Sequence, residues 1–238
     1  MVAQADARSL PQQGASDAQL SVRNVSVRFG GIIALDGVSF DVAPGRIAGL
    51  IGPNGAGKTT LFNCLSRLYV PDAGDILFEG RSILDQPRHA IPRIGIGRTF
   101  QNVALFDHMS VLDNIKVGCH SRTSTGFITN AVRLPKSEPE ERRITERAEE
   151  LVEFMDLAAF AAGLNHDEVD VLRGQIRRVR DTQHVTVLLV EHHMSLVMSV
   201  SDQVVAIDFG RKIAEGTPAE VQAHPAVIEA YLGSKEPA

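Results

Sequence analysis

The sequence predicts an α/β domain built around a parallel β-sheet, and three observations support this fold class. A glycine-rich loop at residues 52–59 stands between an apolar stretch typical of a strand and a segment of helical character. A second apolar run, Val185 to Val190, has the β-branched composition of a strand buried in a parallel sheet. The 238 residues are 44% hydrophobic, which suffices for one sizeable core but not for two full domains.

The chain before the loop predicts an antiparallel pair of strands. Residues 1–18 are rich in Ala, Gln, Ser and Asp and contain no apolar stretch, so we expect a disordered lead before a folded domain at residues 19–238. Leu20 to Phe29 and Ile33 to Val42 have the composition of strands, and a Gly-Gly turn separates them. An antiparallel β subdomain is therefore expected to precede the loop.

The loop and the residues after it predict alternating strands and helices. Ile47 to Ile51 is the strand that leads into the loop, and Thr60 to Leu68 is the helix that follows it. A turn then leads to a short strand at Asp75 to Phe78, and Ile94 to Phe100 predicts a further strand.

The second half of the chain predicts a helical arm and a return to the sheet. Residues 103–161 form the arm, in which Ile144 to Phe160 has a helical pattern. Asn165 has the form of an N-cap, so a helix is expected from His166 to about Arg180.

The chain after the apolar run predicts one more strand and a closing helix. Val204 to Ile207 predicts the strand, which ends at Gly210, and Pro218 to Leu232 predicts the helix.

Composition excludes several classes of protein. The net charge is -5 and the isoelectric point is about 5.9, so no basic field is present and we expect no nucleic-acid partner. Cys64 and Cys119 match no metal or CxxC spacing, which fits buried thiols in a reducing compartment. No run approaches the roughly 18 apolar residues of a membrane span, so we expect a cytosolic protein that serves a membrane process only by docking onto another subunit.

The loop itself carries a complete phosphate-binding motif, Gly-Pro-Asn-Gly-Ala-Gly-Lys-Thr. Its backbone N–H groups can cradle an anion at the positive end of the following helix, with Lys58 reaching the β- and γ-phosphates and the Thr59 hydroxyl on Mg²⁺. A glycine-rich turn without a ligand is the alternative interpretation. The residues expected to bind the nucleotide here are Gly52, Pro53, Asn54, Gly55, Ala56, Gly57, Lys58, Thr59 and Thr60.

Five motifs in order resemble the ATP-binding subunits of ABC transporters, and more narrowly those of branched-chain amino acid importers. The loop is one of them, the second along the chain, and the resemblance covers about residues 20–233. The other four are Phe29-Gly30-Gly31, Arg98-Thr99-Phe100-Gln101, Glu191-His192-His193-Met194 and Ala230-Tyr231-Leu232-Gly233. The family usually has Asp where this chain has His193.

The resemblance implies a P-loop NTPase with a RecA-like core, an antiparallel β subdomain and a helical subdomain. It implies a transport ATPase that binds ATP and Mg²⁺, with membrane permease subunits and a second ATP-binding subunit as partners, located at the inner face of the cell membrane. By the same resemblance, Phe29 would stack on adenine, Gln101 would contact Mg²⁺ or the attacking water, and His192 would sense the γ-phosphate. As isolated residues, all three have structural interpretations.

Two parts of the family pattern are missing from this sequence. The signature turn of LSGGQ type and the Walker B strand ending Asp-Glu should stand between the arm and the Val185 run. Family spacing places the gap near Ala161 and Ala162 and its length at about 35 residues, enough for one helix and one strand. The helical subdomain is then truncated, and we expect ATP binding with impaired hydrolysis, because a general base and electrostatic donors are lost.

Other interpretations remain open. Leu172 to Arg178 has a signature-like sequence, which would make Glu191 the catalytic base, and Val204 to Asp208 has the form of a Walker B strand. The chain could instead be a non-hydrolysing nucleotide-binding subunit, or a non-functional product of an internal deletion or a misread frame. A small-molecule kinase or GTPase shares the loop, but a guanine-reading NKxD-like element is absent.

Overall fold

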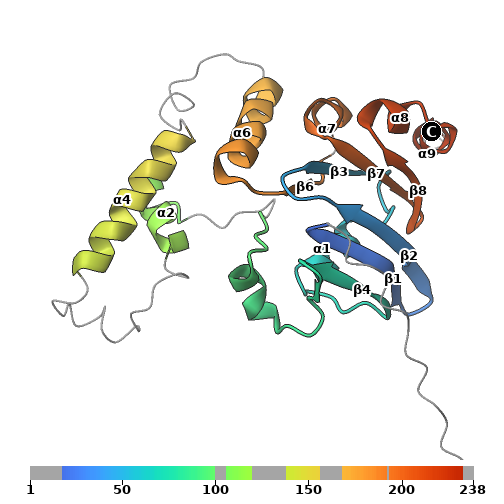
Figure 1. The fold of residues 1–238 in the computed structure, drawn as a ribbon, viewed down its shortest axis with the longest axis horizontal. Coiled ribbons are helices and arrows are strands. Elements are labelled where there is room, and N and C mark those ends of the chain that lie inside the picture. Colours follow the sequence, from blue (N-terminus) through green and yellow to red (C-terminus); the bar gives the residue numbers. More distant parts are fainter. Residues whose placement is uncertain (1–17, 100–105, 120–137, 156–167, 192, 233–238) are drawn as a thin grey trace, which may run out of the picture. The chain divides into compact units, whose positions relative to one another are not determined.

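The computed structural model describes residues 18–99, 106–119, 138–155, 168–191 and 193–232. The chain divides into two compact units. The core unit comprises residues 1–98 and 172–238, and the arm unit comprises residues 99–171. Figure 1 shows the strands of the core unit and the helices of the arm unit.

An antiparallel sheet of four strands forms the first part of the core unit. Its strands are β1 (Leu20–Phe29), β2 (Ile32–Val42), β4 (Ala73–Phe78) and β5 (Arg81–Ser82), in the order β2-β1-β4-β5. β1 and β2 form a hairpin whose turn contains Gly30 at a φ of 58°, a conformation that glycine adopts without strain. The expected antiparallel start is confirmed.

A second, mixed sheet carries the glycine-rich loop. Its strands are β3 (Ile47–Ile51), β6 (Val187–Leu189), β7 (Gln203–Asp208) and β8 (Arg211–Gly216), in the order β6-β3-β7-β8. Both β6 and β7 run parallel to β3, and β8 returns antiparallel to β7. The predicted parallel sheet is thus present, with the loop-bearing strand between two parallel neighbours.

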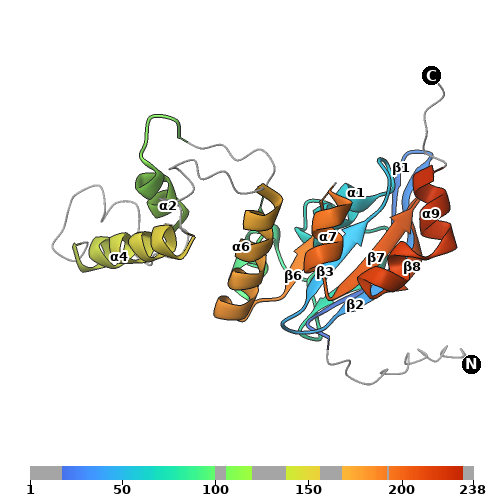
Figure 2. The ribbon, with the colours of Figure 1, turned by 90° about the horizontal axis from the view of Figure 1, so that it is seen from above.

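Helices and the first sheet cover the two faces of this mixed sheet. Alternate residues of β7 face opposite cores: Val205 and Ile207 pack with the helix after the loop and with the antiparallel sheet, while Val204 and Ala206 pack on the other face. The core-unit helices are α1 (Lys58–Leu65), α6 (Glu168–Gln183, within this unit from residue 172), α7 (Met194–Val200), α8 (Pro218–Gln222) and α9 (Pro225–Leu232). Figure 2 shows α7, α8 and α9 beside the mixed sheet.

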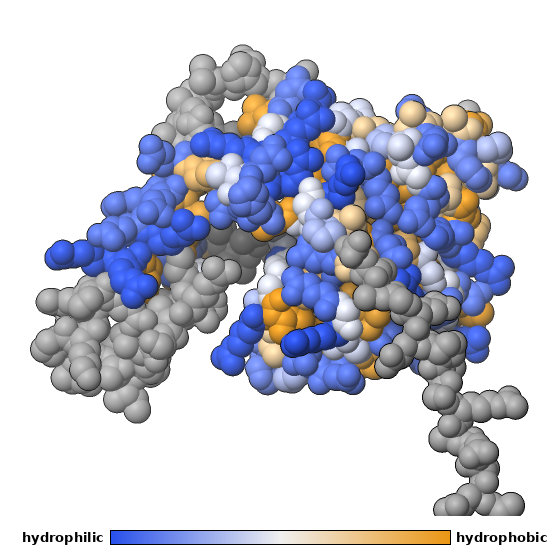
Figure 3. All heavy atoms as spheres, in the orientation of Figure 1, coloured by the Kyte–Doolittle hydropathy of each residue, from blue (hydrophilic) through white to orange (hydrophobic). Residues whose placement is uncertain are grey.

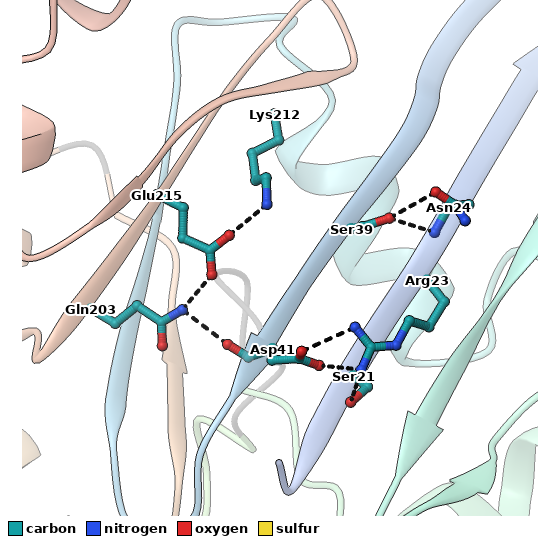
Figure 4. A network of polar contacts seen from close by, with 8 residues as sticks. All are labelled: Ser21, Arg23, Asn24, Ser39, Asp41, Gln203, Lys212 and Glu215. Atoms are coloured by element: carbon teal, nitrogen blue, oxygen red, sulfur yellow. Dashed lines mark hydrogen bonds and ion pairs between the residues drawn. The ribbon is translucent and has the colours of Figure 1, made fainter. Parts of the chain in front are cut away.

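Polar side chains connect the two sheets (Figure 4). The Gln203 side-chain amide on β7 donates to the backbone oxygen of Asp41 on β2 at 2.9 Å and to a carboxylate oxygen of Glu215 at 2.8 Å. The Asp41 carboxylate in turn pairs with Arg23 on β1 at 2.9 Å. These contacts hold the two sheets in a fixed position relative to each other, which the sequence alone does not reveal.

Over its described residues, 94–99, the strand predicted at Ile94 to Phe100 is not formed. Residues Arg88–Ile94 make a 3₁₀ helix, η1, and residues 95–99 have neither helical nor strand structure. A strand needs a neighbour for its backbone hydrogen bonds, and within the described ranges β6 is the last strand on this side of the sheet. Arg98 instead anchors the segment to α1, donating to the Asn63 side chain at 2.9 Å and the Ser66 hydroxyl at 3.0 Å.

The carboxyl-terminal region also differs from prediction. The expected helix from Pro218 to Leu232 is two helices, because Pro225 has no N–H to continue the first and instead begins the second. β8, at Arg211–Gly216, has no counterpart among the strands expected from the sequence.

The arm unit contains α2 (Val111–Cys119) and α4 (Glu138–Phe154), which pack against each other. Ala148 of α4 is fully buried. α4 begins six residues before the helix expected at Ile144, and residues 156–160 lie outside the described ranges.

The coloured part of the face shown in Figure 3 is mostly hydrophilic, with hydrophobic side chains gathered in patches. In the part of the chain that the structure describes, no helix combines the length and the apolar character that crossing a bilayer would need.

Candidate functional site

The glycine-rich loop emerges from the most deeply buried strand of the mixed sheet. All five residues of β3 are buried, and the loop leads directly into α1 at Lys58. Because β6 and β7 run parallel to β3, the loop stands at the carboxyl ends of three parallel strands. That edge is where open α/β sheets bind their ligands.

Three glycines determine the path of the loop. Gly52, Gly55 and Gly57 have φ values of 154°, 80° and 103°, a region that residues with a Cβ avoid. A Cβ on Gly52 would lie 2.2 Å from the backbone oxygen of Ile207, and one on Gly57 would lie 2.6 Å from that of Ala34. A Cβ on Gly55 would meet nothing within 4 Å, so the loop is open on that side.

The backbone of the β7–β8 turn is hydrogen-bonded to the loop and to β2. The Gly210 N–H donates to the Ala56 oxygen at 3.0 Å, and the Gly210 oxygen accepts from the Asp36 N–H at 2.8 Å. Gly210 has a φ of 78°, and a Cβ there would lie 2.7 Å from the Ala34 oxygen. The sequence predicts Gly210 only as the end of a strand, since its one local signal is a glycine three residues after the apolar run that ends at Ile207.

Lys58 lies inside the loop. Its side chain is buried, and its Nζ donates to the Gly52 oxygen at 2.6 Å and the Pro53 oxygen at 2.8 Å. Burial lowers the pKa of Lys58, since desolvation disfavours the ammonium form. The two carbonyl contacts place the amine where it can exchange these oxygens for those of a phosphate.

The first turn of α1 offers further donors for an anion. Its N-cap is Gly57, which has no side chain to accept a hydrogen bond from the first turn. The first turn contains no acidic residue either. The backbone N–H groups there and the positive end of the helix dipole favour a negative ligand. Thr59 is exposed and Thr60 half-buried, so the Thr59 hydroxyl is placed at the surface of the site, as its predicted role as a metal ligand requires. These residues fit MgATP.

Phe29 presents an exposed aromatic ring at the end of β1. Its side chain is 46% exposed and lies edge-to-face against Tyr69, with ring centroids 5.2 Å apart. Ile32 and Ile33 of the same hairpin are also exposed. An exposed ring beside apolar neighbours suits base stacking, and the adenine role of Phe29 stays a prediction.

Several of the remaining residues with predicted roles lie outside the described ranges. Gln101 and His192, and the expected junction at Ala161 and Ala162, lie outside the described residues. Their roles in metal binding, phosphate sensing and chain organisation therefore stay predictions.

Two acidic residues stand at or just after the ends of strands, at the same edge of the sheet as the loop. Glu191 stands two residues beyond Leu189, which pairs with Gly49 of β3, and it is half-buried. Asp208 ends β7, and its carboxylate accepts from the Phe209 N–H at 3.0 Å. The signature-like segment at Leu172 to Arg178 lies inside α6, where the helix itself uses the N–H groups.

Two family models match this chain. One is described as ABC transporter and matches residues 35–187. The chain belongs to the ABC transporter family. The other model, described as branched-chain amino acid ATP-binding cassette transporter, matches residues 211–237. In this ABC transporter chain, the first match runs through the arm unit and the second lies after it in the sequence.

Curated relatives and a solved structure agree with the assignment. The high-affinity branched-chain amino acid transport ATP-binding protein BraF of Pseudomonas aeruginosa is 38% identical, and LivG of Escherichia coli, which has the same description, is 35% identical. Each match covers 90% of this chain and 97% of the relative. A crystal structure of an ATP-binding cassette of an ABC transporter in its ADP conformation has a TM-score of 0.75 and 25% identity, covering 92% of this chain and all of the cassette. The predicted P-loop NTPase fold is confirmed.

The relatives carry residues that this ABC chain lacks. The match to BraF runs over 248 positions, whereas 90% of 238 residues is about 214. About 34 positions of the match (248 less 214) thus have no residue in this chain. This length is close to that of the block whose absence the sequence predicts, while its place near residues 161 and 162 stays a prediction.

Proposed function

We propose that this chain is the ATP-binding subunit of an importer for branched-chain amino acids and that it binds MgATP through residues 52–60. The single observation that carries the proposal is the braced loop, with Lys58 inside it and an uncapped helix behind it. BraF and LivG, which resemble this chain over nearly their whole length, support the substrate class. The partners would be permease subunits at the inner face of the cell membrane and a second ATP-binding subunit.

Each part of the site has a defined task in this function. The N–H groups of the first turn of α1 and the Lys58 ammonium hold phosphate oxygens, and Thr59 holds the metal ion. The exposed ring of Phe29 offers a stacking surface to the base. Bound MgATP supplies the phosphoryl chemistry of the family.

We propose further that this chain binds ATP without efficient hydrolysis. Within the described residues, Glu191 and Asp208 are the carboxylates that follow strands at the loop edge, and neither belongs to an Asp-Glu pair. Without a paired acid, the attacking water lacks a positioned base, which typically contributes about 10² to 10⁴ in rate. The alternative is a complete catalytic site in which Glu191 is the base.

The test combines MgATP binding with phosphate release on the purified full chain. Lys58→Ala is expected to weaken binding by more than about tenfold, because a charge-assisted contact to phosphate is removed. Lys212→Ala is the matched control: Lys212 pairs with Glu215 on β8 and is not part of the loop. A folded wild-type chain that fails to bind MgATP would overturn the proposal.

Phosphate release separates the two catalytic alternatives. We expect wild-type turnover no higher than that of Lys58→Ala. Measurable turnover that Glu191→Gln abolishes would instead establish Glu191 as the base. A chain without a cooperative unfolding transition would favour the non-functional deletion product.

A further inference from the structure

The last helix of the core unit contacts the first residue of the nucleotide loop. The Gly52 N–H donates to the hydroxyl of Tyr231 on α9, with 2.8 Å between nitrogen and oxygen. The two residues are 179 positions apart in the chain. The resemblance motif that contains Tyr231 gives no reason to expect this contact.

Tyr231 is held in place by the packing of its own helix. Val227, one turn earlier on α9, is 3% exposed in a cluster that also contains Ile51, the residue before Gly52. The Tyr231 ring packs against the same cluster. A tyrosine hydroxyl is protonated and uncharged at neutral pH, and burial raises the pKa of Tyr231 further in the same direction.

Gly52 is constrained at each of its backbone groups. Tyr231 holds its N–H, Lys58 holds its oxygen at 2.6 Å, and the Ile207 oxygen blocks the space beside its Cα. The contact from Tyr231 fixes the peptide plane before Gly52, and the contact from Lys58 fixes the peptide plane after it. Gly52 has a φ of 154° and no side chain that would restrict its backbone, so these contacts hold its conformation. If Lys58 exchanged the Gly52 oxygen for a phosphate oxygen, the contact from Tyr231 would be the remaining hydrogen bond of the two described here.

We propose that Tyr231 is a positioning residue that fixes the backbone of Gly52 and thereby raises the affinity of the loop for nucleotide phosphates. The proposal rests on the nucleotide binding proposed above. A loop already held in its binding conformation loses less conformational freedom when the ligand enters, and the difference appears as affinity. The Gly52 N–H itself is directed to Tyr231, so the hydroxyl acts through the shape of the loop.

Tyr231→Phe removes the hydroxyl and keeps the ring. We expect MgATP and MgADP to bind about three- to tenfold more weakly, the effect of losing one partly buried hydrogen bond. Val227→Ala is the matched control, because it loosens the packing of α9 and leaves the hydroxyl present. Equal losses of affinity in both variants, or no loss in Tyr231→Phe, would overturn the proposal.

A second measurement needs no nucleotide. Hydrogen exchange of the Gly52 amide, followed by NMR in glycine-labelled full-length chain, is expected to be at least about tenfold faster in Tyr231→Phe than in Val227→Ala when both are compared under conditions of equal global stability. Unchanged exchange at Gly52 would overturn the positioning role even if the chain bound no ATP. Faster exchange in a chain that binds no ATP would confirm the contact, overturn its role in affinity and count against the proposed function separately.

Discussion

The two flanks of the loop-bearing strand differ sharply. On one side β7 has six residues, its four central ones are buried, and it is paired on both edges. On the other side β6 has three half-buried residues and, within the described chain, a strand partner only in β3. The β7 side is a complete hydrophobic core, whereas the β6 side is shallow.

The helix beside β6 is held differently from those beside β7. The described core-unit residues of α6 include none that is buried. Polar contacts tie it to the end of α7 and to the residues after it: Arg173 donates to the Ser199 hydroxyl at 3.0 Å, and Arg180 pairs with Asp202 at 3.4 Å. The Arg180 and Asp202 side chains are 23% and 26% exposed. One hydrogen bond and one partly buried ion pair contribute less to stability than a buried apolar core does, so this helix is held more weakly.

The two flanks of β3 bear on different functions: the β7 flank on nucleotide binding and the β6 flank on catalysis. The residues that hold the loop by hydrogen bonds from this side are Gly210, in the turn after β7, and Tyr231, on α9. The expected missing block precedes β6 in the chain. The flank that shapes the phosphate cradle is therefore present in this chain, whereas the proposed deficit in hydrolysis would fall on the β6 flank.

Restoring the proposed missing block before β6 should have the largest effect of the changes considered, and that effect is on the rate of ATP hydrolysis. Inserting the aligned BraF segment between Ala161 and Ala162 is expected to raise ATP hydrolysis by about 10² to 10⁴, because a positioned base and charge stabilisation return. Phosphate release with saturating MgATP measures the change. A Gly/Ser insert of the same length is the control and should leave hydrolysis at the wild-type level; equal turnover in all three proteins would contradict the comparison.

Matched truncations should reveal the difference in packing between the flanks. Ile207→Ala on β7 removes a fully buried side chain and is expected to lower the free energy of unfolding by about 2–5 kcal/mol. Leu188→Ala on half-buried β6 should cost roughly half of that or less, because less apolar surface leaves the core. Denaturant titration of both variants measures this, and similar costs would mean that the flanks are equally well packed.

The smallest effect concerns the two sides of the loop itself. Gly57→Ala combines a left-handed backbone with a clash against Ala34, and should destabilise the core by about 2–4 kcal/mol. Gly55→Ala meets open space and carries the backbone strain alone, about 1–2 kcal/mol. Thermal unfolding distinguishes them; a Gly55 variant as unstable as the Gly57 variant would show that the open side is packed after all.

Much of the fold and part of the site follow from the sequence. The strands at 20–29 and 47–51, the helix after the loop, and the phosphate-binding motif all depend on local periodicity and glycine spacing. The strand expected at Ile94 to Phe100 failed because a strand depends on a neighbour as well as on its own residues.

The sequence by itself determined which segment can bind a phosphate, because that capacity resides in consecutive backbone N–H groups, Lys58 and the glycines between them. Only the tertiary structure decided what holds that segment in shape. The contacts from Gly210 to Ala56 and from Gly52 to Tyr231 join residues more than 150 positions apart, and no local pattern encodes them. They arise because β7 and α9 pack against the strand that carries the loop.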